Sequence, residues 1–245
     1  MAKLAGVICA GGAGERLMPL TMVTNKHLLP VYDRPMILYP IKTLVDSGIT
    51  DIVIITGGYY AGEYLKLLGD GKEYGITNLQ YVYQRKPRGG IADALSYAEN
   101  FVNGRKCVVI LGDNIFEENV KNQIEEFKNQ ESGAKIFLKP VSDIHKYGVA
   151  RVENSKVVEI EEKPVRFDSN LAVVGVYMYD EKVFDIIRTL VPSNRGELEI
   201  TDVNKEYLKR KNLTYGNVSG YWCDCGSIEN LMECSIRMYT KEKKS

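Results

Sequence analysis

Short apolar runs alternate with stretches of helical spacing over the first 140 residues of the chain. The runs that predict strands are 4–10, 51–56, 79–84, 107–111 and 134–139, and the stretches that predict helices are 36–47, 60–68, 91–101 and 120–129. The run 107–111, CVVIL, is apolar throughout, which is typical of a strand buried on both faces. Repeated strand–helix units of this kind predict a mostly parallel sheet with helices on both faces.

The pattern of the second half is richer in strands. It predicts a hairpin with strands at 149–152 and 156–160, a long strand at 171–179 and a further strand at 213–218. Helical spacing returns at 181–189, 199–211 and 227–239, and Thr201 or a neighbour is the expected cap of the second of these helices. Because no linker, repeat or low-complexity segment separates the halves, we expect one α/β domain with a Rossmann-like sheet and an insertion in its second half.

Composition and charge indicate a globular protein and argue against one that binds nucleic acid or a membrane. Hydrophobic residues make up 44% and charged residues 26% of the 245 residues, as in an average globular domain. Basic and acidic residues both number 32, so the chain lacks the positive charge that favours binding to nucleic acid or to a membrane surface. No apolar run approaches the ~18 residues of a membrane span, and Glu15 and Arg16 end the N-terminal run too early for a signal peptide. We expect a cytoplasmic protein that binds neither nucleic acid nor a membrane.

The five cysteines do not suggest a disulfide framework. Cys9 and Cys107 lie inside apolar runs, where buried free thiols are common. Cys223 and Cys225 are separated by one residue, which fits poorly the two-residue spacing of a zinc or redox pair. We expect all five, Cys234 included, to be reduced, and Cys223 and Cys225 to serve packing rather than to bind a soft metal.

A glycine-rich loop, AGGAGERL at 10–17, follows the first predicted strand. Small residues let backbone N–H groups approach an anion closely. The loop is neither a Walker A loop, which ends in Gly-Lys-Ser or Gly-Lys-Thr, nor a dinucleotide fingerprint, because Leu17 stands where the third glycine belongs. Arg16 and Lys26 follow, with Pro19 and Pro30 fixing the path of the chain. A planar guanidinium and a point charge beside such a loop suit a triphosphate.

Five segments together resemble the sugar-1-phosphate nucleotidyltransferases, and within them the glucose-1-phosphate thymidylyltransferases. They are GGAGERLMPLTMVTNKHLLPVYDRPMI near the start, LGDNIF at 111–116, EEKP at 161–164, RGELEITDVN at 195–204 and YWCDCGS at 221–227. The resemblance implies transfer of dTMP from dTTP to α-D-glucose 1-phosphate, giving dTDP-glucose and pyrophosphate, as the first step towards dTDP-rhamnose and other deoxysugars. It also implies a homo-oligomer, a dimer or a tetramer, of the short form that lacks the C-terminal segment used by longer members in allosteric control.

The resemblance divides the single domain, 1–245, into three parts. These are a nucleotide-binding part at about 1–140, a sugar-phosphate-binding part at about 141–226 and a C-terminal helix at about 227–240. Because the reaction joins two phosphorylated anions, it needs cationic clamps, Mg²⁺ and positioning more than it needs a nucleophile. The resemblance makes Asp113 and Asp224 the Mg²⁺ ligands, although Asp113 by its position could also cap the helix that follows.

The resemblance also assigns the other site residues. The expected catalytic residues are Arg16, Lys26, Lys163 and Asp113. The expected nucleotide contacts are Ala10, Gly11, Gly12, Gly14, Glu15, Arg16, Lys26, His27, Gln84, Gly89, Gly90 and Asp113. The expected sugar-phosphate contacts are Asn114, Tyr147, Gly148, Glu162, Lys163, Val174, Gly175, Tyr177, Arg195 and Trp222. Without the family, the charge run 161–163 would be a solvated segment and Tyr177 a half-buried strand aromatic.

Three positions depart from the common pattern of the family. Glu15 replaces Thr beside the loop, and its carboxylate is expected to point away from the triphosphate. His27 and Asp93 each replace a Gln near the expected base pocket. Gln84 can donate and accept at once, which suits the imide edge of thymine or uracil. The two replacements leave the choice between these bases open.

Three other functions compete with this interpretation. The first is an enzyme of the same fold that uses UTP or another sugar. The second is a regulatory subunit that binds nucleotide sugars without turnover, and the presence of Arg16, Lys26, Asp113, Lys163 and Asp224 argues against it. The third is a nicotinamide dehydrogenase, which predicts an acidic residue at the end of the second strand, where the sequence has Thr-Gly-Gly at 56–58.

Overall fold

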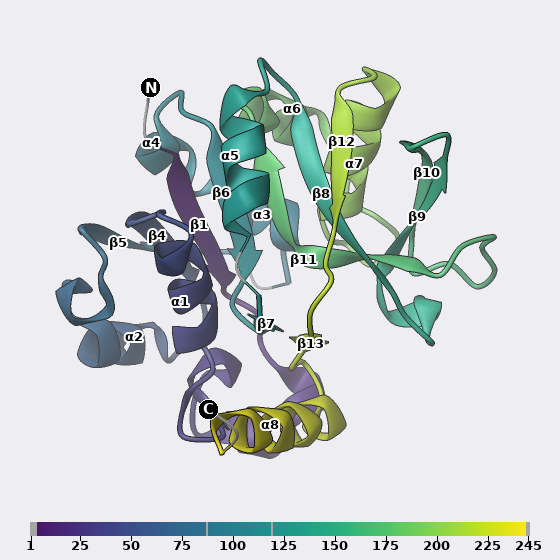
Figure 1. The fold of residues 1–245 in the computed structure, drawn as a ribbon. Coiled ribbons are helices and arrows are strands. Elements are labelled where there is room, and N and C mark those ends of the chain that lie inside the picture. The colour runs from purple at the N-terminus through teal and green to yellow at the C-terminus, as the bar shows by residue number, and fades with distance from the viewer. Residues whose placement is uncertain (1–3, 87, 119, 244–245) are drawn as a thin grey trace.

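The computed structural model describes residues 4–86, 88–118 and 120–243. Within these ranges, nine strands form one mixed sheet. Figure 1 shows the sheet running through the molecule, with helices packed along it and the helix α8 (Ile228–Glu242) at the opposite end from the N-terminus. This arrangement confirms the predicted α/β fold.

The first half of the sheet is parallel. β1 (Ala5–Ala10) lies between β6 (Cys107–Leu111) and β4 (Asp51–Thr56), and β5 (Asn78–Tyr83) pairs with β4. The predicted strands match these bounds to within one residue at either end. The carboxyl ends of the parallel strands therefore meet along one edge of the sheet, where the glycine-rich loop begins.

Antiparallel strands complete the sheet. β11 (Leu171–Tyr179) runs antiparallel to β6, to β8 (Ala134–Pro140) and to β9 (Gly148–Glu153). β9 forms the predicted hairpin with β10 (Lys156–Glu162), and β12 (Leu213–Asn217) is parallel to β8. The long β11 thus joins the parallel half of the sheet to the β9–β10 hairpin (Figure 1).

The other helices follow the predicted positions with one break. They are α1 (Leu38–Asp46), α2 (Ala61–Leu68), α3 (Ile91–Ser96), α4 (Glu99–Val102), α5 (Lys121–Asn129), α6 (Val183–Thr189) and α7 (Ile200–Lys209). The single helix predicted at 91–101 is wrong, because Tyr97 and Ala98 donate to carbonyls three residues back and tighten the chain into a turn. The expected cap of α7 is Thr201 or a neighbour: Glu199 holds the N-cap position without a side-chain cap bond, and Thr201 lies inside the helix.

Short elements that the apolar pattern did not predict connect the longer ones. They are the 3₁₀ turns η1 (Glu15–Leu17), η2 (Leu20–Met22), η3 (Lys26–Leu28), η4 (Lys72–Tyr74) and η5 (Ile144–Lys146), and the short strands β2 (Pro30–Val31) and β3 (Arg34–Pro35). Across the part of the chain that is described, no helix combines the length and apolar character that a bilayer crossing needs.

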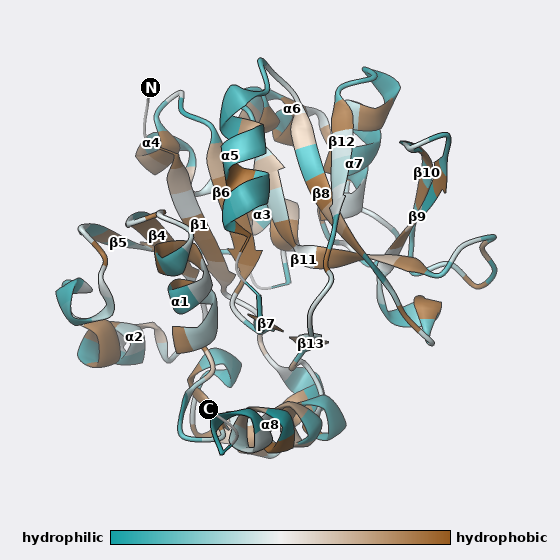
Figure 2. Ribbon diagram, viewed as in Figure 1, coloured by the Kyte–Doolittle hydropathy of each residue, from teal (hydrophilic) through white to brown (hydrophobic). Residues whose placement is uncertain are grey.

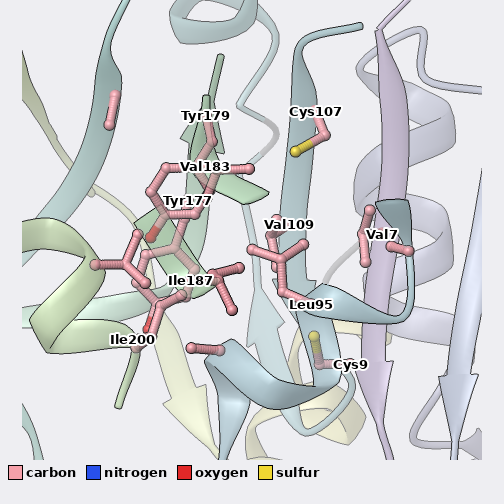
Figure 3. Close-up of a cluster of buried hydrophobic side chains, with 14 of the residues drawn as sticks. Val7, Cys9, Leu95, Cys107, Val109, Tyr177, Tyr179, Val183, Ile187 and Ile200 are labelled. Atoms are coloured by element: carbon pink, nitrogen blue, oxygen red, sulfur yellow. The ribbon is translucent and has the colours of Figure 1, made fainter. Parts of the chain in front are cut away.

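Side chains of β1 alternate between two cores. Val7 and Cys9 pack with residues of α3, α6 and α7 on one face, and Ile8 and Ala10 pack with residues of α1, α2 and α5 on the other. Figure 3 shows the first of these cores, with Leu95 of α3 beside the sheet strands. Figure 2 shows brown, apolar colour along β1, β4 and β6 and teal over much of α5. Burial on both faces holds the central strands rigidly, which fixes the loops at their carboxyl ends.

A small antiparallel ladder stands apart from the main sheet. β7 (Asn114–Phe116) follows β6 after a short turn and pairs with β13 (Trp222–Asp224). α8 packs below this ladder against the purple segment near the N-terminus in Figure 1. The third core lies between them: Leu17, Leu29, Val31, Met36, Ile115, Cys223, Cys225, Leu231, Cys234 and Met238. The ladder joins the middle of the chain to its C-terminal part at the edge where the parallel strands finish.

Candidate active site

A cleft of about 730 Å³ opens at the carboxyl ends of β1 and β6. Open α/β sheets bind their ligands at this edge. The structure brings most of the predicted residues to its wall: Gly11, Gly12, Gly14, Glu15, Arg16, Lys26, His27, Gln84, Gly89, Gly90, Asp113, Asn114, Tyr147, Gly148, Glu162, Lys163, Gly175, Tyr177, Arg195, Trp222 and Asp224. Ala10 and Val174 are not part of this wall, because both side chains are fully buried in the core with α1, α2 and α5.

The β7–β13 ladder brings the two predicted metal ligands together. Asp113 immediately precedes β7, and Asp224 ends β13, where the register pairs it with Asn114. The Cys225 N–H also donates to the carbonyl oxygen of Asp113 over 2.9 Å. Asp113 is only 7% exposed, and both carboxyl groups line the cleft. A backbone ladder thus fixes two carboxylates that lie far apart in the sequence.

Lys26 pairs with one of these carboxylates. Its ammonium donates to Asp113 Oδ2. Lys26 begins the 3₁₀ turn η3, which Asn25 caps by accepting the N–H of His27 over 3.0 Å. A Cβ on Gly12 would lie 3.2 Å from the Lys26 ammonium nitrogen, so the loop backbone passes directly beside that charge. An anion held by the loop would therefore also meet Lys26.

Arg16 faces the other carboxylate. It lies on η1, directly after Gly14, which adopts a left-handed conformation with φ 70°. A Cβ on Gly226 would lie 2.7 Å from Arg16 Nη2 and 2.8 Å from Asp224 Oδ1. Only glycine leaves room here for the guanidinium and the carboxylate on the same side of the chain. Arg16 and Lys26 thus reach the carboxylate pair from one loop region.

The charge of the pair fits a divalent cation. Burial alone would raise the pKa of Asp113, but the Lys26 ammonium holds that pKa well below its usual range. Burial, and next the Asp113 carboxylate, raise the pKa of Asp224 to about 6. The two carboxylates therefore repel each other, and Lys26 and Arg16 offset only part of this effect at Asp224, whose pKa stays raised. Because Mg²⁺ prefers oxygen ligands and binds through one or two carboxylates plus substrate phosphates, the donor set suits it.

His27 occupies a different environment from the expected contact with a base. Its ring is 1% exposed, and Nδ1 lies 2.7 Å from Asn25 Oδ1 and 3.0 Å from the Tyr64 hydroxyl. Tyr64 also donates to the Ala10 carbonyl, 3.1 Å away. This buried network holds the start of the loop to η3 and leaves little of the ring for a base. The structure therefore does not support the expected contact between His27 and the base.

We expect acid to destabilise the protein through His27. Burial and then Lys26 lower the pKa of His27 to about 3 in the folded chain, whereas an unfolded histidine has a pKa of about 6.5. Only the unfolded chain takes up this proton between those values, so stability that is present above pH ~6.5 is lost as the pH falls towards ~3. At pH 5 this loss should reach about 2 kcal/mol.

Urea unfolding at pH 7 and pH 5 measures the loss. His27→Gln should reduce the difference between the two pH values, and His145→Gln, at the other histidine, should keep it. An equal difference in the wild type and in His27→Gln would contradict the assignment.

Gln84, which also lines the cleft, is held in one orientation. Its backbone N–H donates to Thr56 over 2.8 Å, directly after β5. Its side-chain Nε2 donates to Asp93 Oδ2 over 2.7 Å and to the Gly90 carbonyl over 3.4 Å. Oε1 points at Gly11, where a Cβ would collide with it. Because Asp93 can only accept as a carboxylate, it fixes which end of the amide faces the loop.

Glu15 and Arg88 pair with each other at the rim of the cleft. Both side chains are largely exposed. The carboxylate of Glu15 is therefore partnered by a guanidinium, which fits the expectation that it stays away from a triphosphate. Pro87, in the same basic loop, lies outside the described residues.

The sugar-side residues form a second network. Glu162 accepts from the Thr201 hydroxyl and lies 3.4 Å from Arg195 Nη2, and burial raises its pKa. Arg195 donates to both oxygens of Glu199, over 2.9 and 2.8 Å. The guanidinium expected to clamp a phosphate is thus already bound to a buried carboxylate, and it positions Glu162 in this structure. Lys163 extends beside this network and lies 3.8 Å from Glu162.

Lys163 has a strained backbone. Its φ is 45°, in the left-handed region that residues with a Cβ rarely adopt. Its N–H donates to the Tyr147 carbonyl over 2.9 Å, and His145 Nδ1 lies 2.8 Å from the carbonyl oxygen of Pro164. These bonds hold the turn after β10 against the η5 segment. Strain of this kind is concentrated at functional sites, which fits the expected role of the lysine.

Asn114 organises the floor of the cleft. Its Nδ2 donates to Asp113 Oδ1 over 3.0 Å, and its Oδ1 accepts from the Gly175 N–H over 3.1 Å and from Trp222 Nε1 over 2.6 Å. The Trp222 ring packs edge-on against Tyr147, with centroids 5.2 Å apart. The hydrogen-bonding groups of Asn114 are therefore used within the protein, and its amide orients the Asp113 carboxylate.

Several residues that position the side chains of the site could not be assigned from the sequence. Asn25 and Tyr64 build the network around His27, and Glu199 and Thr201 build the network around Glu162. Glu199 and Thr201 lie in the segment RGELEITDVN, so the motif pointed to the region without giving their roles. Nothing in the sequence marks Tyr64, because its partners come from other elements.

Comparisons with known proteins identify the family of the chain. Residues 5–241 match the model of the nucleotidyl transferase family. Glucose-1-phosphate thymidylyltransferase from Xanthomonas campestris is 42% identical over 96% of this chain and 80% of its own length. Enzymes of the same name from an Actinoplanes species and from Neisseria meningitidis are 41% and 40% identical, over 94% and 97% of this chain and 76% and 83% of their own.

Two solved structures have the same fold. A Bacillus anthracis protein, assigned as a glucose-1-phosphate thymidylyltransferase and crystallised with sucrose, is 50% identical with a TM-score of 0.91, over 96% of this chain and 94% of its own. A UDP-glucose pyrophosphorylase complexed with UDP-glucose is 26% identical with a TM-score of 0.85, over 98% of this chain and all of its own. The chain is therefore an enzyme that belongs to the nucleotidyl transferase family.

Proposed function

We propose that the protein transfers dTMP from dTTP to α-D-glucose 1-phosphate, giving dTDP-glucose and pyrophosphate for deoxysugar synthesis. The observation that carries this proposal is that one cleft is lined by Arg16, Lys26, the Asp113–Asp224 pair and Lys163. Such a cleft suits two phosphorylated substrates. The names of the relatives supply the identity of nucleotide and sugar.

The residues of the chain position both substrates in this proposal. The backbone of the glycine-rich loop, Arg16 and Lys26 bind the triphosphate, and Lys163 binds the phosphate of the sugar. Asp113 and Asp224 hold Mg²⁺, which when bound neutralises phosphate charge and activates the α-phosphorus as a Lewis acid. The sugar phosphate then attacks the α-phosphorus in line, and pyrophosphate leaves without a covalent enzyme intermediate.

Isotope exchange tests this reaction. Labelled pyrophosphate should enter dTTP only when glucose 1-phosphate is present, because the reverse reaction needs dTDP-glucose. Exchange without a sugar phosphate would indicate a covalent nucleotidyl-enzyme and contradict the proposed in-line step. No exchange with glucose 1-phosphate, but exchange with another sugar phosphate, would contradict the proposed substrate.

The fixed orientation of Gln84 supports selection of an imide base. Because Asp93 and the Gly90 carbonyl take its amide hydrogens, Oε1 remains as an acceptor. Thymine and uracil carry a ring N–H donor at their imide edge, whereas cytosine carries an acceptor there. We infer that Asp93, where the family commonly has Gln, favours imide bases over cytosine by preventing the amide from turning over.

Asp93→Leu should weaken this selection. We expect the ratio of kcat/KM for UTP over CTP to fall about tenfold, since a hydrogen bond to a charged partner contributes roughly 1.5–3 kcal/mol. Asp93→Asn, which can still accept, should keep most of the ratio, and the KM for glucose 1-phosphate should stay constant in both. An unchanged ratio in Asp93→Leu would show that Asp93 has no part in the choice of base.

A uridylyltransferase is the second candidate. The acceptor that Gln84 presents suits uracil as well as thymine, and one structural neighbour is a UDP-glucose pyrophosphorylase. The two activities share every phosphate and metal residue proposed above. They differ only in the nucleotide that gives the higher kcat/KM.

Location in the cytoplasm and assembly into a homo-oligomer are further proposals. The five cysteines are free, as in proteins of a reducing compartment. On α8, Ile228, Met232 and Ile236 follow each other at intervals of four residues and are 42%, 62% and 59% exposed. An exposed apolar stripe of this kind favours self-association. Light scattering of the purified chain gives the mass of the assembly.

A further inference from the structure

Three cysteines meet in the core beneath the active site. Cys223 and Cys225 belong to β13 and the residue after it, and Cys234 comes from α8. Their sulfur atoms all lie within 4.8 Å of one another, and those of Cys223 and Cys225 are 3.9 Å apart. The sequence spacing of Cys223 and Cys225 did not suggest a metal site, because the third sulfur comes from a distant helix.

The spacing of these sulfurs suits a soft metal ion. Two thiolates on a tetrahedral Zn²⁺, each at about 2.3 Å, lie about 3.8 Å apart. The distance between Cys223 and Cys225 is close to this value without any ion. Each of the three side chains is less than 9% exposed. The three ligands are therefore gathered before an ion binds, and little water competes for them.

A buried hydroxyl group lies beside the cluster. The Tyr221 hydroxyl oxygen is inaccessible to solvent and interacts with the thiols of Cys223 and Cys234. Its ring packs against the same core. An ion among the sulfurs would offer this oxygen a ligand position, and three sulfurs with one oxygen would complete a tetrahedral set.

We propose that Cys223, Cys225 and Cys234 form a binding site for a soft cation such as Zn²⁺ or Cd²⁺, separate from the carboxylate pair of the cleft. Each thiol that binds the ion releases its proton to the solvent. The harder Mg²⁺ prefers oxygen ligands and would remain with Asp113 and Asp224. The two sites thus select different metals by the softness of their donors.

The position of the cluster connects it to the active site. Successive side chains of a strand point to opposite faces, so Asp224 faces the cleft while Cys223 and Cys225 face the core. Asn230 of α8 ties the two together, because its Nδ2 donates to the Asp224 carbonyl over 2.7 Å and its own carbonyl lies 3.6 Å from the Cys223 sulfur. An ion at the cluster would therefore clamp α8 to the strand that carries a catalytic carboxylate.

Cadmium loading tests the site. The full chain is refolded from urea with Cd²⁺ present, so that the closed core does not block entry, and is then freed of excess metal by gel filtration. We expect about one Cd²⁺ per chain with an ultraviolet thiolate-to-cadmium absorption band, and Zn²⁺ should displace the band. Cys234→Ser should lose the band, and Cys107→Ser, which changes an equally buried cysteine outside the cluster, should keep it. A refolded wild type without the band would overturn the proposal, as would a band that Cys234→Ser retains.

X-ray absorption of the zinc-loaded wild type gives a test that needs no variant. It should show about three sulfur ligands at about 2.3 Å. A shell of oxygen and nitrogen alone would place the ion elsewhere and overturn the proposal. Neither readout depends on the nucleotidyl transfer reaction, so failure of that reaction would leave this test intact.

Discussion

Asp113→Asn should lower kcat by at least about a hundredfold, the scale seen when one preorganised electrostatic group is lost. The substitution keeps the shape of the side chain but removes its charge. Lys26 then loses its partner, and Asp224 remains as the single charged ligand for the metal. The variant should also need more Mg²⁺ for half-maximal rate, because one of two carboxylates no longer attracts the ion.

Steady-state rates over a range of Mg²⁺ concentrations measure this effect. Asp46→Asn is the matched control, since Asp46 is an exposed aspartate at the end of α1 that pairs with Lys42. It should keep the wild-type rate and Mg²⁺ dependence. Circular dichroism shows whether each variant is folded. A folded Asp113→Asn with a near-wild-type rate would contradict the assignment of the metal site.

Two substitutions of Lys163 should have the same effect on activity but different effects on stability. Lys163→Ala and Lys163→Gly both remove the ammonium, so both should lower kcat/KM for glucose 1-phosphate by about a hundredfold. Only glycine also relieves the left-handed backbone, whose φ is 45°. Lys163→Gly should therefore be about 1 kcal/mol more stable than Lys163→Ala, after the greater entropy of glycine in the unfolded chain is subtracted.

Lys211 provides the matched control for this pair. It also has a left-handed backbone, with φ 58°, but it lies after α7 and does not line the cleft. Lys211→Gly should likewise be more stable than Lys211→Ala, while both keep full activity. Urea unfolding and initial rates measure the two quantities. If the Lys163 variants kept wild-type kcat/KM for the sugar phosphate, the proposed phosphate contact would be wrong.

The central strands could be predicted closely from the sequence. β4 and β6 have the predicted bounds, because each contains a continuous apolar run, 52–55 or 107–111, and is followed by glycine. Burial on both faces imposes such a run, and few other structures share it. These strands also determine where the cleft lies, since parallel strands carry their loops to one end of a sheet.

The β7–β13 ladder could not be predicted from the apolar pattern. Each strand has three residues, and Asn114 and Asp224 pair across it. So short a strand gives no periodicity to detect, and its partner lies in a remote part of the chain. The pairing of Asp113 with Asp224 therefore came from resemblance to the family, and the structure supplied the physical reason for it.

The side-chain networks of the site also could not be predicted from the sequence. Arg195 had the residue type of a phosphate clamp, but Glu199, one helical turn away, binds its guanidinium. His27 followed a lysine of the site, but Asn25 and Tyr64 hold its ring in the interior. In both cases the position of a functional group could be predicted from the sequence, but not the partner that determines its orientation.

Pyrophosphate release from glucose 1-phosphate and Mg²⁺, measured in turn with dTTP, UTP, CTP, ATP and GTP, tests the central claim most directly. We predict the highest kcat/KM with dTTP, lower turnover with UTP and little with CTP, and at least about a hundredfold lower turnover in Asp113→Asn. A clear preference for UTP would keep the mechanism and overturn the assignment of thymine. Absence of pyrophosphate release with every nucleotide would contradict the proposed reaction itself.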